Sequence, residues 1–216
     1  MKIKNILIST LLLGTVVGFS GCGMDDEEMT SPHTYSVAVT NITAGQPMSP
    51  VLLTTNSLFS VGESASLGLE KLAEGGDNSE LLDSNGVSGS GLLTPGSSET
   101  LSLSTSEISL SIATMLVKTN DAFAGVNEYK VSDLALNESK TIYLSVYDAG
   151  TEANSETNTT IAAFGVEGFN ATRNDSDTVS IHSGVITKED GLTTSALTAM
   201  EKFNNPAVVV TITRTK

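Results

Sequence analysis

ETLSLSTSEISLSIATMLV, residues 99–117, is the stretch that decides the fold. Leu, Ile and Val alternate with Ser and Thr along most of its length, and a period of two is typical of strands with one buried face. A polar interruption at residues 105–107 breaks the alternation. The stretch therefore predicts two β-strands joined by a turn.

Similar patterns lie on both sides of this stretch. Tyr35, Val37 and Val39 alternate with small and polar residues, and the other segments are rich in the β-branched residues that favour strands. The further predicted strands are residues 34–40, 51–55 (VLLTT), 141–147 (TIYLSVY) and 207–213 (AVVVTIT).

Helical spacing is confined to a small part of the chain. In residues 64–74 (SASLGLEKLAE), Ala65, Leu69 and Leu72 fall on one helical face, and two glycines end the pattern. A second helical turn is expected at residues 80–82. Several short strands with so little helix predict an all-β fold, an antiparallel β-sandwich with one or two short helices in its loops.

The N-terminus has the organisation of a secretory leader. Lys2 and Lys4 precede an apolar run over residues 6–19, and Ser20 and Gly21 are small residues directly before Cys22. A basic start, a short apolar segment and small residues at the cleavage point define a signal peptide. The apolar run is shorter than the ~20 residues that a membrane-spanning helix needs.

Cys22 is the only cysteine in the chain, so no intrachain disulfide can form. Its place after the small residues predicts cleavage before it and fatty acylation of its thiol, as in a bacterial lipoprotein. We expect a signal peptide over residues 1–21, a lipidated and acidic tether over 22–33, and one domain over 34–216. Gly23 at the second mature position fits sorting to the outer membrane, and the expected location is the cell envelope.

The exported part of the chain is strongly acidic. The chain has 11 basic and 25 acidic residues, and the leader contains two of the basic and none of the acidic ones, so the exported part has a net charge of −16. Such a surface repels nucleic acids and anionic lipids. It suits divalent cations or basic partners, and it excludes nucleic-acid binding.

Two acidic turns follow predicted strands. Asp121 lies in TNDAFAG, residues 119–125, and Asp148 and Glu152 lie in YDAGTE, residues 147–152. If the strands pair suitably, the three carboxylates converge at one rim of the sandwich, where Ca²⁺ prefers oxygen ligands on loops. The alternative is that Asp121 and Asp148 cap their own turns through backbone hydrogen bonds.

Three segments resemble the spondin N-domain family. They are E-S-A-S-x-G-L-E-x-L-A-E-x-G at residues 63–76, the segment T-N-D-A-F-x-G-V at residues 119–126, and Y-D-A-G-T-E at residues 147–152. Their order and approximate spacing agree with that family over residues 34–213. The resemblance implies a C2-like calcium-binding β-sandwich that acts in adhesion.

The resemblance also implies that Asp121, Asp148 and Glu152 bind Ca²⁺, with Glu152 where the animal domains have Asp. The chain contains no thrombospondin-type repeat, so the animal adhesion partners do not transfer. We expect a non-enzymatic module, anchored to the membrane by its lipid, with an extracellular glycan or protein ligand. The alternatives are a purely structural envelope protein and a Ca²⁺-dependent hydrolase.

Nothing in the sequence marks a catalytic residue. His33 lies beside the tether, and His182 lies in a region rich in Asp and Ser. A lone histidine of this kind is expected at the surface rather than as a general base.

Overall fold

The computed structural model describes residues 31–165 and 168–216. The predicted signal peptide, Cys22 and most of the tether lie outside the described residues. Within these residues, no helix is long and apolar enough to cross a membrane.

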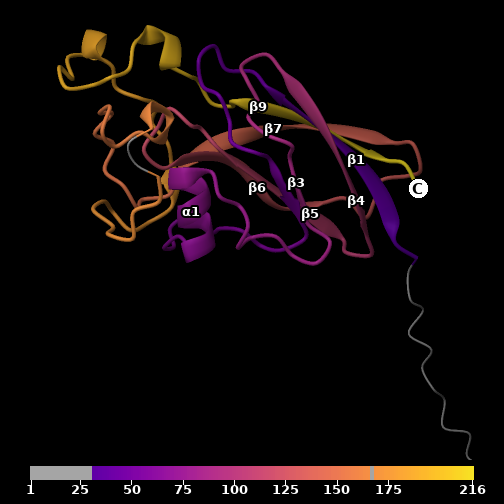
Figure 1. The fold of residues 1–216 in the computed structure, drawn as a ribbon. Helices are drawn as coiled ribbons and strands as arrows, with labels where there is room; N and C mark the ends of the chain where they lie inside the picture. The colour runs from indigo at the N-terminus through magenta and orange to yellow at the C-terminus, as the bar shows by residue number, and fades with distance from the viewer. Residues whose placement is uncertain (1–30, 166–167) are drawn as a thin grey trace, which may run out of the picture. The chain divides into compact units, whose positions relative to one another are not determined.

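The described residues form nine strands and one α-helix (Figure 1). The strands are β1 (His33–Asn41), β2 (Leu52–Thr54), β3 (Val87–Ser88), β4 (Ser98–Thr105), β5 (Ser109–Met115), β6 (Ala122–Lys130), β7 (Ser139–Asp148), β8 (Ser180–Ile181) and β9 (Val208–Arg214). The helix is α1 (Leu67–Gly75), and three short 3₁₀ turns occupy Ala162–Phe164, Lys188–Asp190 and Ala199–Glu201.

All strand pairs are antiparallel, in the order β3-β2-β5-β6-β7-β9-β1-β4, with β8 pairing to β7. Strand β7 belongs to two sheets, because its first residues pair with β9 and its last residues pair with β6. Strands β3 and β4, at the two ends of the order, also contact each other. The structure confirms the predicted all-β antiparallel class, and the strands curl into an almost closed, sandwich-like arrangement.

Alternation along the strands builds the main core. Val37 and Val39 of β1, Leu103 of β4 and Val210 and Ile212 of β9 are all buried, whereas the residues between them face outward. Burial of each such side chain stabilises the fold by roughly 1.5–3 kcal/mol. The pattern of residues 99–117 is therefore realised as β4 and β5, with the turn between them as expected.

A second core lies under helix α1. Ser66 caps the helix by accepting a hydrogen bond from the N–H of Leu69 over 3.2 Å, and Gly76 ends it with a φ of 72°. Leu69 and Leu72 are buried, and they belong to the same hydrophobic cluster as Phe123 of β6. The helix contacts β5 and β6, so it covers the sheet that carries the predicted acidic turns.

Two local predictions were wrong. Residues 119–125 were expected to be a turn, but β6 begins at Ala122 and only residues 119–121 precede it. Residues 122–125 are buried throughout between β5 and β7, so they lack the alternation of a half-exposed strand. Residues 80–82 form part of a turn and not a helix.

Candidate metal-binding rim

The two predicted acidic turns meet at one edge of the sheet. Asp121 directly precedes β6, Asp148 is the last residue of β7, and Ala122 pairs with Asp148 in the strand register. The N–H of Ala149 donates to the carbonyl oxygen of Asp121 over 3.2 Å. The segment that follows β7 gathers at this end of the strands, opposite the C-terminus (Figure 1). Asp121 and Asp148 therefore share one rim.

Asp121 is fully buried and joins the two loops. Its Oδ2 atom accepts hydrogen bonds from the backbone N–H of Thr151 over 2.8 Å and from that of Glu152 over 3.0 Å. The hydroxyl of Thr151 donates to the same atom over 3.2 Å. The other oxygen, Oδ1, has no hydrogen-bond partner within residues 31–165 and 168–216. One oxygen of this carboxylate thus holds the loop.

Gly150 makes the close approach of this loop possible. Its φ is 72°, and a Cβ atom there would lie 2.6 Å from both the backbone N and the carbonyl O of Thr178. Only glycine combines this backbone conformation with such a contact. The glycine in YDAGTE is therefore required by the packing of the loop as well as by its turn.

Asp148 caps its own turn, as the alternative hypothesis predicted. Its Oδ1 accepts a hydrogen bond from the N–H of Gly150 over 2.8 Å, and its Oδ2 accepts one from the side chain of Asn154 over 2.6 Å. Glu152 is 4% exposed, and its Oε2 accepts a long hydrogen bond of 3.5 Å from the Asn120 side chain. All three predicted acids are at the rim, and all three also take part in local hydrogen bonding.

Three residues that sequence reasoning missed complete the rim. Glu156 is fully buried, and its N–H donates to Asn120 Oδ1 over 3.2 Å. Asn154 contacts Asp148, as described above. His182 is 3% exposed, so the expectation that it lies at the surface was wrong. Its N–H donates to the carbonyl oxygen of Val146 over 3.1 Å, which draws it beside the end of β7.

Four buried polar atoms at this rim have no hydrogen-bond partner among the described residues. They are Asp121 Oδ1, Asn154 Oδ1, Glu156 Oε2 and His182 Nε2. Buried polar atoms are normally paired, because an unpaired one costs about 1–3 kcal/mol. Three of the four are oxygens, which are the ligands that hard cations prefer.

Burial at the rim raises the pKa of two carboxyl groups and so disfavours their charged forms. Burial, reinforced by the charge of Asp148, raises the pKa of Asp121 to about 7 despite the hydrogen bonds to its Oδ2. Burial and the charges of Asp121 and Asp148 raise the pKa of Glu156 to about 7. None of the ion pairs among the described residues includes Asp121, Asp148 or Glu156. A bound cation would relieve this repulsion.

His182 contributes differently from the acids. Burial lowers its pKa, and the nearby charge of Asp148 opposes that shift. Its Nδ1 accepts a hydrogen bond from the N–H of Gly184 over 2.9 Å, so in the neutral ring the proton is on Nε2. An Nε2–H group is a hydrogen-bond donor, and it serves an anion or water rather than a metal ion.

The oxygen chemistry fits Ca²⁺, but the predicted three-carboxylate set is not assembled. In the described part of the chain, no group of three or more His, Cys, Asp or Glu side chains is arranged so that it could hold a metal ion. Carboxylate oxygens of both Asp121 and Asp148 already accept hydrogen bonds from nearby backbone N–H groups. Asn154 Oδ1 and Glu156 Oε2 are the further buried oxygens of the rim without a hydrogen-bond partner among the described residues.

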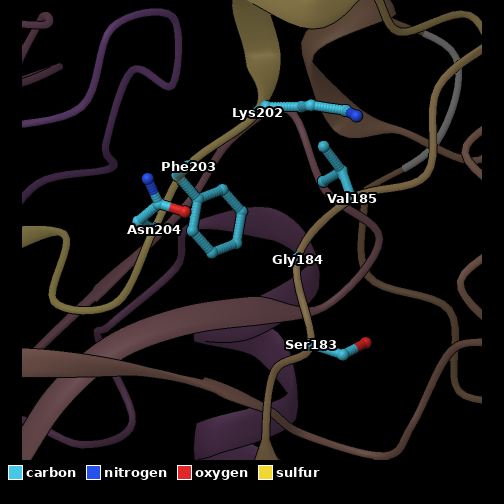
Figure 2. A pocket seen from close by; sticks show the side chains of 6 residues that line it. All are labelled: Ser183, Gly184, Val185, Lys202, Phe203 and Asn204. Carbon is cyan, nitrogen blue, oxygen red and sulfur yellow. The ribbon is translucent and has the colours of Figure 1, made fainter. Parts of the chain in front are cut away.

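A shallow hollow lies beside the rim. It has a volume of about 340 Å³ and is lined by Ser183, Gly184, Val185, Lys202, Phe203 and Asn204. Figure 2 shows the Phe203 ring in this hollow, with Ser183 and Val185 on the facing segment. The ring centroids of Phe203 and His182 are 5.5 Å apart. None of the described residues that line the hollow is an acid, so it is distinct from the carboxylate cluster.

The chain matches no protein-family model and no curated protein. The likeness to the spondin N-domain remains a prediction from the three sequence segments.

Proposed function

We propose that this protein is an exported, lipid-anchored binding module of the cell envelope, in which Ca²⁺ orders the rim loops. It acts without catalysis, and its rim and outer surfaces contact an extracellular glycan or protein. The acylated thiol of Cys22 attaches the tether to the outer membrane. The alternative that shares this architecture is a structural envelope protein whose rim only stabilises its own loops.

The observation that carries the calcium proposal is the set of unpaired buried oxygens. Asp121 Oδ1, Asn154 Oδ1 and Glu156 Oε2 are buried and have no hydrogen-bond partner among the described residues. Asn154 donates to Asp148, and the N–H of Glu156 donates to Asn120, so both belong to the segment that folds against Asp121 and Asp148. Leaving these oxygens unpaired in an interior with mutually repelling carboxylates is costly without a cation. The residues that would hold it are Asp121, Asp148 and Glu152, joined by Asn154 and Glu156. The ion would supply positive charge and a common ligand for both loops.

Calorimetric titration with CaCl₂ tests this proposal, using the soluble chain that begins at residue 23. Saturable binding is expected, together with a higher melting temperature in calcium than in chelator. Asp121→Asn should abolish both effects. Asp175→Asn, an exposed acid of a neighbouring loop, is the matched control and should preserve them.

Three results would separate the remaining functions. No heat of binding at millimolar calcium would refute the metal site. Calcium binding without retention on any glycan or matrix protein would favour the structural alternative. Turnover of an ester, peptide or glycoside that is lost in folded Asp148→Asn would favour a hydrolase.

The anchoring proposal has its own test. Mass spectrometry of the protein from membranes should show an N-terminus at Cys22 carrying acyl chains. Cys22→Ser should move the protein to the soluble fraction of the envelope. Cleavage elsewhere, or an unmodified cysteine, would refute lipid anchoring without affecting the calcium proposal.

A further inference from the structure

The outer face of four neighbouring strands has an unusual composition. In the pairs β4–β1, β1–β9 and β9–β7, residues directly opposite each other point to the same side of the sheet. The outward positions are 98, 100, 102 and 104 in β4, 34, 36, 38 and 40 in β1, 209, 211 and 213 in β9, and 139, 141 and 143 in β7. We name this surface the hydroxyl face.

Every residue of the hydroxyl face is Ser or Thr except Ala38, Val209 and Tyr143. All of them are exposed or half-buried, and α1 covers the other sheet. The face therefore presents a regular array of hydroxyl groups, with strands ~4.8 Å apart and outward side chains ~7 Å apart along each strand. The strand spacing is close to the length of one sugar ring.

Eight of the eleven hydroxyls on this face are paired across strands, and the pairs keep spare hydrogen-bonding capacity. The side-chain oxygens of Thr34 and Ser104 are 2.8 Å apart, and those of Thr141 and Thr211 are 3.2 Å apart. Each hydroxyl has one donor and two acceptor sites. A bonded pair therefore keeps one donor and three acceptors for a ligand, and the pairing holds the side chains in place before the ligand arrives.

The hydroxyl face also differs in charge from the rest of the protein. The four strands lie wholly within the described residues, and none of their outward side chains on this face is charged, although the chain has a net charge of −14. Tyr143 stands at one corner of the face, beside Val209, with 64% of its surface exposed. An exposed tyrosine offers a flat apolar ring with a polar end.

We propose that the hydroxyl face binds a chain of a neutral polysaccharide. The sugar hydroxyls exchange hydrogen bonds with the Ser and Thr array, and one sugar ring stacks on Tyr143. The absence of charge suits a neutral polymer, whereas an anionic polymer is repelled by the acidic remainder of the surface. The twist of a β-sheet favours a single flexible chain over a flat crystalline surface. This proposal does not depend on the calcium rim.

Affinity electrophoresis of the purified protein in chelator tests the proposal, with hydroxyethylcellulose, xyloglucan, laminarin or dextran cast in native gels. Retardation by at least one of these neutral polymers is expected, and it should persist at high salt, because screening does not weaken contacts between uncharged groups. Thr211→Lys, at the centre of the face, and Tyr143→Ala, at its corner, should each weaken retardation at least 10-fold. Thr193→Lys, an exposed threonine outside the face, is the matched control and should have no effect.

Several outcomes would overturn the proposal. Migration unchanged by all four polymers would do so. Retardation that survives both Thr211→Lys and Tyr143→Ala would place the binding elsewhere. A dimer in analytical ultracentrifugation that Thr211→Lys dissociates would assign the face to a second copy of the chain. Melting curves of each variant check that a loss of retardation does not come from unfolding, and Tyr143→Ala leaves the hydroxyl array intact if the lysine variant fails to fold.

Discussion

The backbone N–H of Thr151 donates a 2.8 Å hydrogen bond to Oδ2 of Asp121, which lies 30 residues earlier in the chain. This bond ties the end of β7 to the start of β6 and uses one oxygen of a fully buried carboxylate. The other oxygen has no hydrogen-bond partner in the part of the chain that the structure describes. Asp121 therefore stabilises the loop through one carboxylate oxygen, and the proposed cation contact would use the other, so the two roles can be separated experimentally.

The stability of the calcium-free protein should depend on the ionisation of Asp121. Burial and Asp148 raise its pKa from 3.8 to about 7 in the folded chain. The folded state then binds more protons than the unfolded state between these values, so the free energy of unfolding falls as pH rises through this window. One pKa unit corresponds to ~1.4 kcal/mol. Denaturant melts in chelator from pH 4 to 8 measure the slope.

Asp121→Asn provides the comparison for that experiment, because it removes the charge and keeps the shape. The lowered pKa of His182 has the opposite effect on the free energy of unfolding. The unfolded chain protonates this histidine below pH 6.5 more readily than the folded chain does, so stability is lost as pH falls. The difference between wild type and Asp121→Asn cancels this effect. A difference that does not change between pH 4 and 8 would contradict the prediction.

Gly150→Ala should destabilise the rim more than a glycine substitution in open space. Gly150 has a φ of 72°, and a Cβ atom added there would lie 2.6 Å from the backbone of Thr178. Gly165 has a similar φ of 77°, and no described residue beyond its chain neighbours lies within 4 Å of a Cβ atom there, so Gly165→Ala is the matched control. In both variants the left-handed backbone should lower the free energy of unfolding by ~1–2 kcal/mol. The clash should lower it by a further ~1–3 kcal/mol in Gly150→Ala. Equal unfolding free energies for the two variants would rule out the clash.

Phe123→Ala should open a cavity in the core under α1. The side chain is fully buried, and its ring centroid lies 5.1 Å from that of Phe59 and 5.5 Å from that of Tyr147. A loss of ~3–5 kcal/mol is expected in urea denaturation. Phe164→Ala removes a ring that is 40% exposed and should cost far less. Similar losses for both would show that the second core is loosely packed.

The Arg173 guanidinium should stabilise the fold mainly because it neutralises the buried carboxylate of Glu70. Glu70 is 3% exposed, and its Oε2 lies 2.8 Å from the Arg173 guanidinium, which ties the loop before β8 to helix α1. Arg173→Met leaves a buried carboxylate without its cation and should cost ~3–5 kcal/mol. The double variant Glu70→Gln with Arg173→Met should recover most of this loss at neutral pH. A double variant as unstable as the single one would contradict the explanation.

Much of the fold was predictable from local pattern. The alternation of residues 34–40 and 99–117 predicted β1, β4 and β5 within a few residues, and residues 64–74 predicted α1. Strand β6 was missed because it is buried on both faces at its start, where alternation is absent. Its first residues also carry the glycine and small side chains of a turn, so local composition favoured the wrong structure.

The site was predictable only in part. Asp121, Asp148 and Glu152 were placed together because each lies at or after the end of a predicted strand. The register of β6 and β7 brings the turns of Asp121 and Asp148 to one edge, but the three carboxylates do not form a group that could hold a metal ion among the described residues. Glu156 and His182 could not be predicted in the same way. They lie in a long segment with no regular alternation, and only the packing of that segment against the rim buries them.

The sequence by itself determined the class of fold and the face of each strand, because period-two alternation depends only on neighbouring residues. It also determined which segments carry acids. The tertiary structure alone decided which strands pair and in what register, because pairing joins residues far apart in the chain. That register aligned the Ser and Thr residues of four strands into one hydroxyl face, and it brought Asp121 and Asp148 to one rim.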